Sequence, residues 1–264
     1  MPLAQEPTPR IVDPRSYLSC LYGESGVGKT TFGSTVDGHY FLFTEAGGSG
    51  VSVYGESVVD WPTFLAKGAE LIKAKNAGWE GQREIKTVFI DTIDSLLEYA
   101  GDWICQNETF VEQGKASKFS KIDDVPWGKG YKRLAQLVLS KIQRLRLAGF
   151  GVFLIGHQKE RIVKWRGQDL TRVGFNMTPS VADTFQAACD AIGYAAVEET
   201  VQKGAAGEVE SVETGRYVYW QPTFLRLAKH RLRGFPARVE FKLDTAWDSY
   251  VEAFNGRVQA LKGQ

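Results

Sequence analysis

Eight consecutive residues near the start of the chain carry the clearest chemistry. Residues 23–30, GESGVGKT, satisfy the phosphate-binding loop pattern G-x-x-x-x-G-K-[ST] at every specified position. The glycines let backbone N–H groups converge on phosphates, Lys29 supplies a point charge, and the Thr30 hydroxyl can ligate Mg²⁺. The pattern therefore predicts a site for a nucleoside triphosphate bound with Mg²⁺. The predicted nucleotide-binding residues are Gly23, Glu24, Ser25, Gly26, Val27, Gly28, Lys29, Thr30 and Thr31.

Two acidic residues follow apolar runs typical of buried strands. Residues 39–45 end at Glu45, and residues 86–91 end at Asp91. Ligands of α/β sheets bind at the carboxyl ends of the strands, so both acids are expected at the nucleotide edge. Asp91 then fits the Walker B position, in the Mg²⁺ shell opposite Thr30. Glu45 is placed to act as a general base towards the attacking water, although a solvated acid in a loop is the alternative.

Another apolar run, residues 151–158, ends in the polar side chains His157 and Gln158. At the same edge of the sheet, either side chain could sense the γ-phosphate. A hydrogen-bonded strand terminus is the alternative interpretation. Between the last two strands, we expect Asp94 to N-cap a helix over residues 95–106 rather than to bind metal.

A basic segment follows this strand. Residues 159–172 hold five basic and two acidic residues around Trp165. Bases can stack on an aromatic ring while Lys and Arg neutralise phosphates, so the segment suits single-stranded nucleic acid. A solvated hairpin remains an equal alternative. The long polar stretch 107–127, with lysines spaced three apart around Phe119, indicates either function or disorder.

The elements that must position these residues alternate between strands and helices. Apolar runs predict strands over 17–22, 39–45, 86–91, 151–158 and 191–197, with helices over 61–75, 128–148, 179–189 and 245–261. Further strands are expected over 216–220, 224–228 and 238–243, with a basic turn at 229–234. This order predicts an α/β fold with a mostly parallel central sheet flanked by helices. Residues 1–15 read as an N-terminal arm and residues 16–264 as a single domain.

Composition sets the remaining limits. The 264 residues are 43% hydrophobic and 24% charged, with a formal net charge of +1. These values are those of a globular protein, and nucleic-acid binding would have to come from local basic patches. No apolar run approaches membrane-spanning length and the first 16 residues are too polar for a signal peptide, so we expect a cytoplasmic protein without membrane contact. Three scattered cysteines, Cys20, Cys105 and Cys189, read as buried apolar residues.

These motifs, in this order, resemble the RecA/RadA and DnaB-like ATPases, and most closely the single-domain RecA-like ATPases of bacteriophages, including single-strand annealing recombinases. The resemblance covers residues 17–243 and includes a C-terminal hairpin with a Lys-x-Arg turn. It implies a RecA-like core, Glu45 as the catalytic glutamate, and segments 107–127 and 159–178 as DNA-facing loops. It also implies that Lys229 and Arg231 reach a neighbouring subunit's nucleotide. The DNA-binding residues expected on this basis are Lys115, Lys118, Lys121, Lys159, Arg161, Lys164, Trp165, Arg166 and Arg172.

The same resemblance implies ATP as the nucleotide, single-stranded DNA as the main partner, self-association into a ring or filament, and a single-strand DNA-binding protein as a further partner. The chain departs from the family pattern at His157, which replaces the usual glutamine, and it carries no clear polymerisation motif.

Other classes stay open. A helicase-type translocase and a nucleotide-switched loading module would use the same motifs. A small-molecule kinase would share Lys29 and Asp91, but it needs neither Glu45 nor a basic C-terminal hairpin. A GTPase would need an Asn-Lys-x-Asp motif, which is absent from the sequence.

Overall fold

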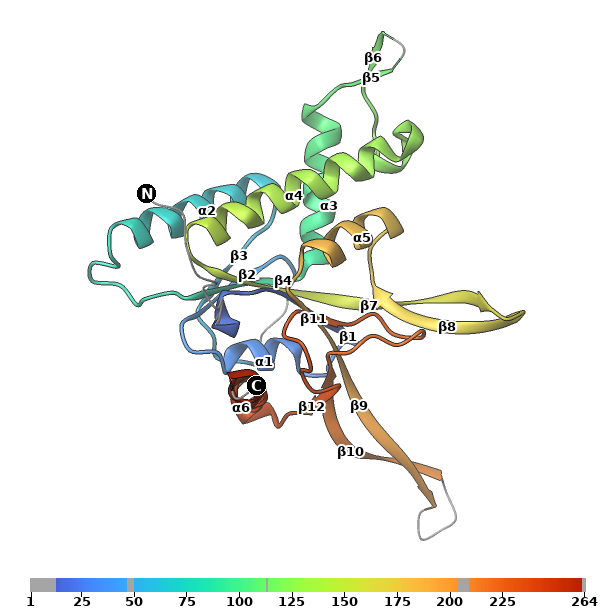
Figure 1. Ribbon diagram of the computed structural model, residues 1–264. Helices are drawn as coiled ribbons and strands as arrows, with labels where there is room; N and C mark the ends of the chain where they lie inside the picture. The colour runs from blue at the N-terminus through green and yellow to red at the C-terminus, as the bar shows by residue number, and fades with distance from the viewer. Residues whose placement is uncertain (1–12, 47–49, 113, 204–208, 263–264) are drawn as a thin grey trace.

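A mostly parallel sheet forms the centre of the protein (Figure 1). The computed structural model describes residues 13–46, 50–112, 114–203 and 209–262. Within these residues, one sheet of ten strands runs in the order β12-β10-β9-β1-β7-β4-β2-β3, with β8 paired to β7 and β11 to β9. The parallel strands are β1 (Leu18–Gly23), β2 (His39–Phe43), β3 (Gly55–Ser57), β4 (Thr87–Asp91), β7 (Gly151–Trp165) and β9 (Ala191–Lys203). The antiparallel strands are β8 (Gln168–Phe175), β10 (Val209–Tyr219), β11 (Lys229–His230) and β12 (Arg238–Glu240). The predicted α/β fold is confirmed.

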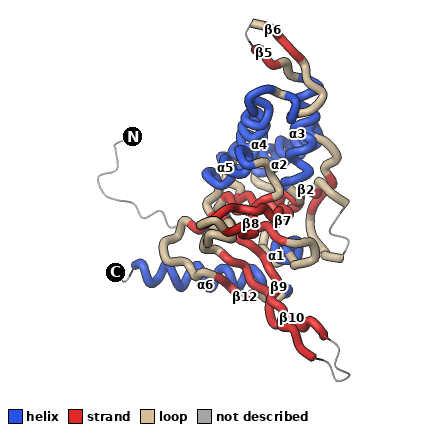
Figure 2. The backbone as a smooth tube through the Cα atoms, turned by 90° about the vertical axis from the view of Figure 1, so that its right-hand side faces the viewer, coloured by secondary structure: helices blue, strands red, loops and turns tan. Residues whose placement is uncertain are grey.

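Helices cover both faces of this sheet (Figures 1 and 2). Strand side chains alternate between the faces, so in β1 Leu18, Cys20 and Tyr22 enter one core while Leu21 enters the other. The first core is closed by α2 (Trp61–Asn76), α3 (Ile93–Asn107), α4 (Lys129–Leu147) and α5 (Pro179–Ala188). The second is closed by α1 (Lys29–Ser34) and α6 (Ala246–Lys262). The buried sheet therefore holds the residues at the ends of its strands in fixed positions.

Local sequence sets the bounds of the longer helices. The Asp60 carboxylate accepts a hydrogen bond of 2.7 Å from the backbone N–H of Thr63 and caps α2, whose first turn holds a proline. One side of α4 is buried, including Leu134, Val138 and Ile142, and α4 ends before Gly149, whose φ of 86° suits a glycine. Both helices pack on the sheet.

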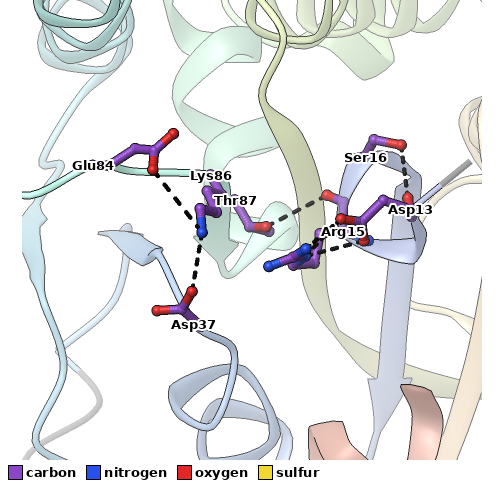
Figure 3. A network of polar contacts seen from close by, with 7 residues as sticks. All are labelled: Asp13, Arg15, Ser16, Asp37, Glu84, Lys86 and Thr87. Atoms are coloured by element: carbon purple, nitrogen blue, oxygen red, sulfur yellow. Dashed lines mark hydrogen bonds and ion pairs between the residues drawn. The ribbon is translucent and has the colours of Figure 1, made fainter. Parts of the chain in front are cut away.

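A short N-terminal turn, η1 (Pro14–Ser16), closes the sheet at the end away from the phosphate loop. Figure 3 shows its anchors: the Asp13 carboxylate accepts from the backbone N–H of Arg15, and the hydroxyl of Thr87 donates to the Arg15 carbonyl over 3.4 Å. A Cβ at position 151 would lie 1.4 Å from that carbonyl oxygen, so Gly151 is required where the turn crosses β7. Residues 1–12 of the predicted arm lie outside the described residues.

Three predicted elements were wrong. The cap of α3 is Thr92, not Asp94, because the Thr92 hydroxyl lies one residue before the first helical residue and accepts from Ser95. Residues 224–228, all within the described part, form turns and isolated bridges instead of a strand. Strand β7 does not stop at Gln158 but runs on into a hairpin with β8. An apolar run in the sequence was therefore not enough to distinguish a strand from a packed turn.

The segment between α3 and α4 is not structureless. It forms a small hairpin of β5 (Phe110–Glu112) and β6 (Lys115–Ser117), followed by short 3₁₀ turns. The three cysteines are buried and unpaired, as expected. Among the described residues, no helix has the length and apolar character needed to cross a membrane.

Candidate active site

The phosphate loop connects β1 to α1 and holds its lysine in place. Lys29 is only 7% exposed, and its Nζ donates to the carbonyl oxygens of Gly23 and Glu24 over 3.0 and 2.6 Å. Burial lowers the pKa of Lys29, an effect that the nearby carboxylate of Asp91 opposes. The ammonium group is therefore held by weak neutral acceptors that the oxygens of a bound triphosphate would replace.

The shape of the loop depends on two glycines and on a distant arginine. Gly26 and Gly28 have φ values of 81° and 98°, which side chains rarely tolerate. From β10, Arg216 donates to the carbonyl of Val27 over 3.1 Å, and Glu213 holds the guanidinium at 2.8 Å. Arg216 was not predicted from the sequence, because it lies 189 positions from Val27 and only the folded sheet brings the two together.

Thr30 and Asp91 meet at the carboxyl end of the sheet as predicted. The Thr30 hydroxyl donates to Oδ2 of Asp91 over 2.7 Å. Burial raises the pKa of the Asp91 carboxyl, whereas the Thr30 hydrogen bond and the charge of Lys29 lower it. Within the described chain, no cluster of three or more His, Cys, Asp or Glu could bind a metal alone. Two oxygen donors beside a phosphate loop fit Mg²⁺, which usually takes its other ligands from phosphates and water.

Glu45 follows β2 and is held by two hydroxyl groups. Its Oε1 accepts from Thr92 Oγ1 over 2.5 Å and from Ser95 Oγ over 2.7 Å. Partial burial alone would raise the pKa of Glu45, but the two hydrogen bonds, together with the nearby His157 and Lys29, outweigh it and leave the pKa below its ordinary value. Glu45 is therefore an ionised acceptor at the edge of the site, as a general base requires.

His157 and Gln158 lie on β7, which separates the phosphate-loop strand from the Asp91 strand. The backbone N–H of His157 donates to Asp94 Oδ2 over 2.9 Å, and its ring Nδ1 lies 3.5 Å from the same oxygen. Gln158 Nε2 donates to Glu24 Oε1, on the phosphate loop, over 3.1 Å. Asp94 thus holds the middle of β7 instead of capping a helix, and both predicted sensor residues contact parts of the nucleotide edge.

These groups line one cleft of about 320 Å³. Its walls include Ser25, Gly26, Gly28, Lys29, Thr30, Thr31, Glu45, Asp91, Thr92 and His157. A second cavity, of about 380 Å³, is lined by Asp94, by residues 121–123 and by residues 176–178. It therefore adjoins both predicted DNA-facing segments.

Lys229 and Arg231 lie elsewhere. Strand β11 pairs with the first residues of β9, at the end of the sheet opposite the phosphate loop. Lys229 Nζ donates to the carbonyl of Gln186 over 2.8 Å, and an Arg231 guanidinium nitrogen lies 2.9 Å from Asp190 Oδ1. The geometry excludes contact of either cation with the phosphate loop of the same chain. Their predicted contact with a neighbouring subunit stays a prediction.

The basic segment after Gln158 is a hairpin of β7 and β8. Alternation along β7 places Lys159, Arg161 and Trp165 on one face and Lys164 on the other, and Arg172 pairs directly with Arg161. Of the first segment, Lys115 and Lys118 belong to or follow the β5–β6 hairpin, while Lys121 lines the second cavity. The two hairpins project from different parts of the molecule (Figures 1 and 2).

The comparison with known families agrees with this geometry. A family model described as an AAA domain matches residues 15–232. The chain belongs to this family. It is thus an AAA-type P-loop ATPase domain, which accounts for the order of the phosphate loop, the Asp91 strand and the strand between them. No curated protein matches the chain.

Proposed function

We propose that this domain is a RecA-like ATPase that hydrolyses ATP with Mg²⁺ and acts on single-stranded DNA in recombination or annealing. The observation that carries the proposal is the continuity of β7. This strand begins in the core, passes the nucleotide cleft at His157, and continues without interruption into the basic hairpin that ends at Trp165. Nucleotide and nucleic acid would then act on one continuous strand, the nucleotide near its middle and the nucleic acid at its outer end.

Different residues of the cleft would bind the phosphates, bind Mg²⁺ and activate the attacking water. Lys29 and the backbone N–H groups of residues 24–28 would hold the phosphates, and Thr30 with Asp91 would hold Mg²⁺. The metal, when bound, neutralises charge that develops on the phosphate oxygens. Glu45 orients the attacking water and accepts its proton, since its carboxylate is ionised and fixed by two hydroxyl groups.

The β7–β8 hairpin supports the nucleic-acid part of the proposal through its charges. Arg161 and Arg172 lie directly opposite each other, and like charges at such positions destabilise an antiparallel pair. Both line a cavity of about 150 Å³ whose lining also includes Asp183. A phosphate of a single strand would offset the repulsion between the two guanidinium groups, and the release of its counterions would favour binding further.

Measuring ATP hydrolysis with and without single-stranded DNA, over a series of salt concentrations, tests the proposal. We expect stimulation at low salt that declines as salt rises, because single-strand contacts depend on counterion release. Hydrolysis that never responds to DNA would contradict it. A nucleotide-switched loading module would instead bind ATP and turn over very slowly with or without DNA.

We also propose that the active form is an oligomer with nucleotide sites at subunit boundaries. Arg231 remains 56% exposed despite its contact with Asp190, so its guanidinium is open to contact with a neighbouring subunit, and it lies at the opposite end of the sheet from the phosphate loop of its own chain. A cation supplied by an adjacent subunit stabilises charge on the γ-phosphate, as arginine fingers do.

Mixing two inactive variants tests this arrangement. Arg231→Ala should be inactive through loss of the cation in trans, and Lys29→Ala through loss of its own site. Together they should recover part of the activity, because some boundaries then combine an intact loop with an intact arginine. If mixtures stay inactive and light scattering shows a monomer with ATP and DNA present, Arg231 serves only its contact with Asp190.

A further inference from the structure

The tip of the β7–β8 hairpin has an uncommon composition. Trp165 pairs with Gln168, so the turn consists of Arg166 and Gly167 alone, with φ values of 50° and 80°. Two-residue turns of this kind need positive φ at both positions, which Gly and Asn tolerate well and arginine does not. The strained backbone of Arg166 places its guanidinium over the Trp165 ring, 4.5 Å from the ring centre.

A second aromatic ring reaches this tip from a distant part of the chain. Phe224 lies between β10 and β11, and its ring centre is 5.6 Å from that of Trp165, at an interplanar angle of 44°. Both rings remain open to solvent, with exposed fractions of 43% for Trp165 and 45% for Phe224. Nucleobases stack on exposed aromatic rings, so the pair is a candidate binding surface.

The position of Phe224 is fixed by backbone hydrogen bonds to the hairpin. Val173 on β8 donates to the carbonyl of Leu225 over 2.8 Å and accepts from the N–H of Leu227 over 3.1 Å. In Figure 1 the segment before β11 runs alongside β8. The two rings and the guanidinium therefore form a preorganised group that does not need the nucleotide cleft to assemble.

We propose that Trp165, Arg166 and Phe224 form a binding site for one nucleobase of a single strand, in which the base replaces the Arg166 guanidinium on the tryptophan ring. The proposal rests on the proposed function and adds Phe224, which lies outside both segments expected to face DNA. The rings are too close together to admit a base between them, so the base stacks on the ring face that the guanidinium covers. The displaced guanidinium then pairs with a phosphate of the same strand.

The exchange is favourable on general grounds. A cation over an exposed ring contributes less binding free energy than a base stacked on that ring, so the base displaces the cation. The guanidinium still has a favourable contact after it leaves the ring, because it forms a charge-assisted hydrogen bond to a phosphate. Arg166 therefore serves twice, keeping the ring face ordered in the free protein and contributing a phosphate contact in the complex.

An abasic oligonucleotide separates base contacts from phosphate contacts. Binding of fluorescently labelled oligo(dT), and of an abasic strand of equal length, is measured by anisotropy in the presence of Mg²⁺ and ATP. Phe224→Ala and Phe224→Leu remove the ring packed beside Trp165, on which the base stacks, so each should weaken oligo(dT) binding by about three- to tenfold, with little change for the abasic strand. Neither should alter the salt slope, whereas Arg166→Ala should lower it by about 0.7.

Leu225→Ala is the matched control, since Leu225 is as exposed as its neighbour but has no ring, and it should bind both strands normally. Thermal unfolding verifies that each variant is folded. If wild-type protein binds oligo(dT) and both Phe224 variants bind it equally well, the site is wrong while the proposed function stands. If wild-type protein binds no single strand, both fail.

Discussion

The two halves of β7 differ in what surrounds them. Residues 151–156 are buried between the two cores, and the polar groups beside them, Lys29 and Asp91, are less than a tenth exposed and held by defined partners. Beyond Gln158 the strand leaves the core and enters the hairpin, where Lys159, Lys164 and Trp165 are exposed and Arg161 is partly buried. One strand thus joins a rigid site to an adaptable surface.

This difference determines how each part responds to change. A buried charge has no substitute partner, so its loss leaves the rest of the site uncompensated. An exposed cation contributes little by itself, and several together provide an electrostatic surface on which the effects of single substitutions are nearly additive. We therefore expect large effects from single substitutions in the cleft and graded effects from substitutions in the hairpin.

The largest effect is expected at Lys29. Lys29→Ala removes the buried cation and should lower the steady-state rate of ATP hydrolysis by about 10³-fold or more, as loss of a preorganised charge in a closed site does. Lys73→Ala, an exposed lysine of α2, is the matched control and should hydrolyse ATP normally. Near-normal turnover by Lys29→Ala would show that Lys29 is not part of the ATPase site. It would also contradict the expected difference between the buried and the exposed half of β7.

Glu45→Gln comes next. The amide keeps the shape of the side chain but cannot accept a proton, so ATP should still bind while hydrolysis falls by about 10² to 10⁴. Because the pKa of Glu45 lies below its ordinary value, the wild-type carboxylate stays ionised as pH falls towards 5 and is protonated only below that pKa. Single-turnover rates over a pH series test both points. Unchanged turnover in the variant would make Glu45 a bystander.

In the exposed half, a triple substitution should have a moderate effect. Replacing Lys164, Trp165 and Arg166 by Ala removes two cations and one ring, so single-strand affinity should fall by about ten- to a hundredfold. The slope of log K against log salt should flatten by about 0.7 for each phosphate group that the variant no longer neutralises. Anisotropy titrations at several salt concentrations measure both quantities. Binding that is unaltered would place the DNA site elsewhere.

The smallest effect is expected at Arg216, which contacts the phosphate loop from outside the cleft. Arg216→Ala removes its hydrogen bonds to loop carbonyls and should raise KM for ATP about three- to tenfold with little change in kcat. Arg238→Ala, an exposed arginine on β12, is the control. A large loss of kcat would show that Arg216 contacts the reacting phosphates, and the buried half of the site would then extend to β10.

The sequence predicted the cleft better than the hairpin for the same physical reason. Lys29, Thr30 and Asp91 lie at fixed offsets from buried strands. The position of a buried strand in the sheet determines where the residue at its end lies. Asp94 was assigned as a cap because helix caps are common, yet its carboxylate bonds to His157, 63 positions away. A local sequence pattern cannot predict a contact between residues so far apart in the chain.

Contacts between distant segments account for the other differences. Residues 224–228 are apolar enough for a strand, but packing against β8 holds them as a turn. The basic turn near Arg231 carries an obvious cluster of charge, and the sequence gives no sign that the buried carboxylate of Asp190 faces it. Tertiary packing, which a motif does not encode, decides these positions.

If the two halves of β7 are coupled, nucleotide and single-stranded DNA each raise the protein's affinity for the other, and one linkage measurement tests this. Affinity of the Glu45→Gln protein for oligo(dT) is measured with and without Mg²⁺-ATP, and its affinity for ATP with and without oligo(dT). The account predicts that ATP tightens DNA binding about tenfold and that DNA tightens ATP binding by the same factor, as reciprocity requires. Equal DNA affinity in both conditions would contradict it.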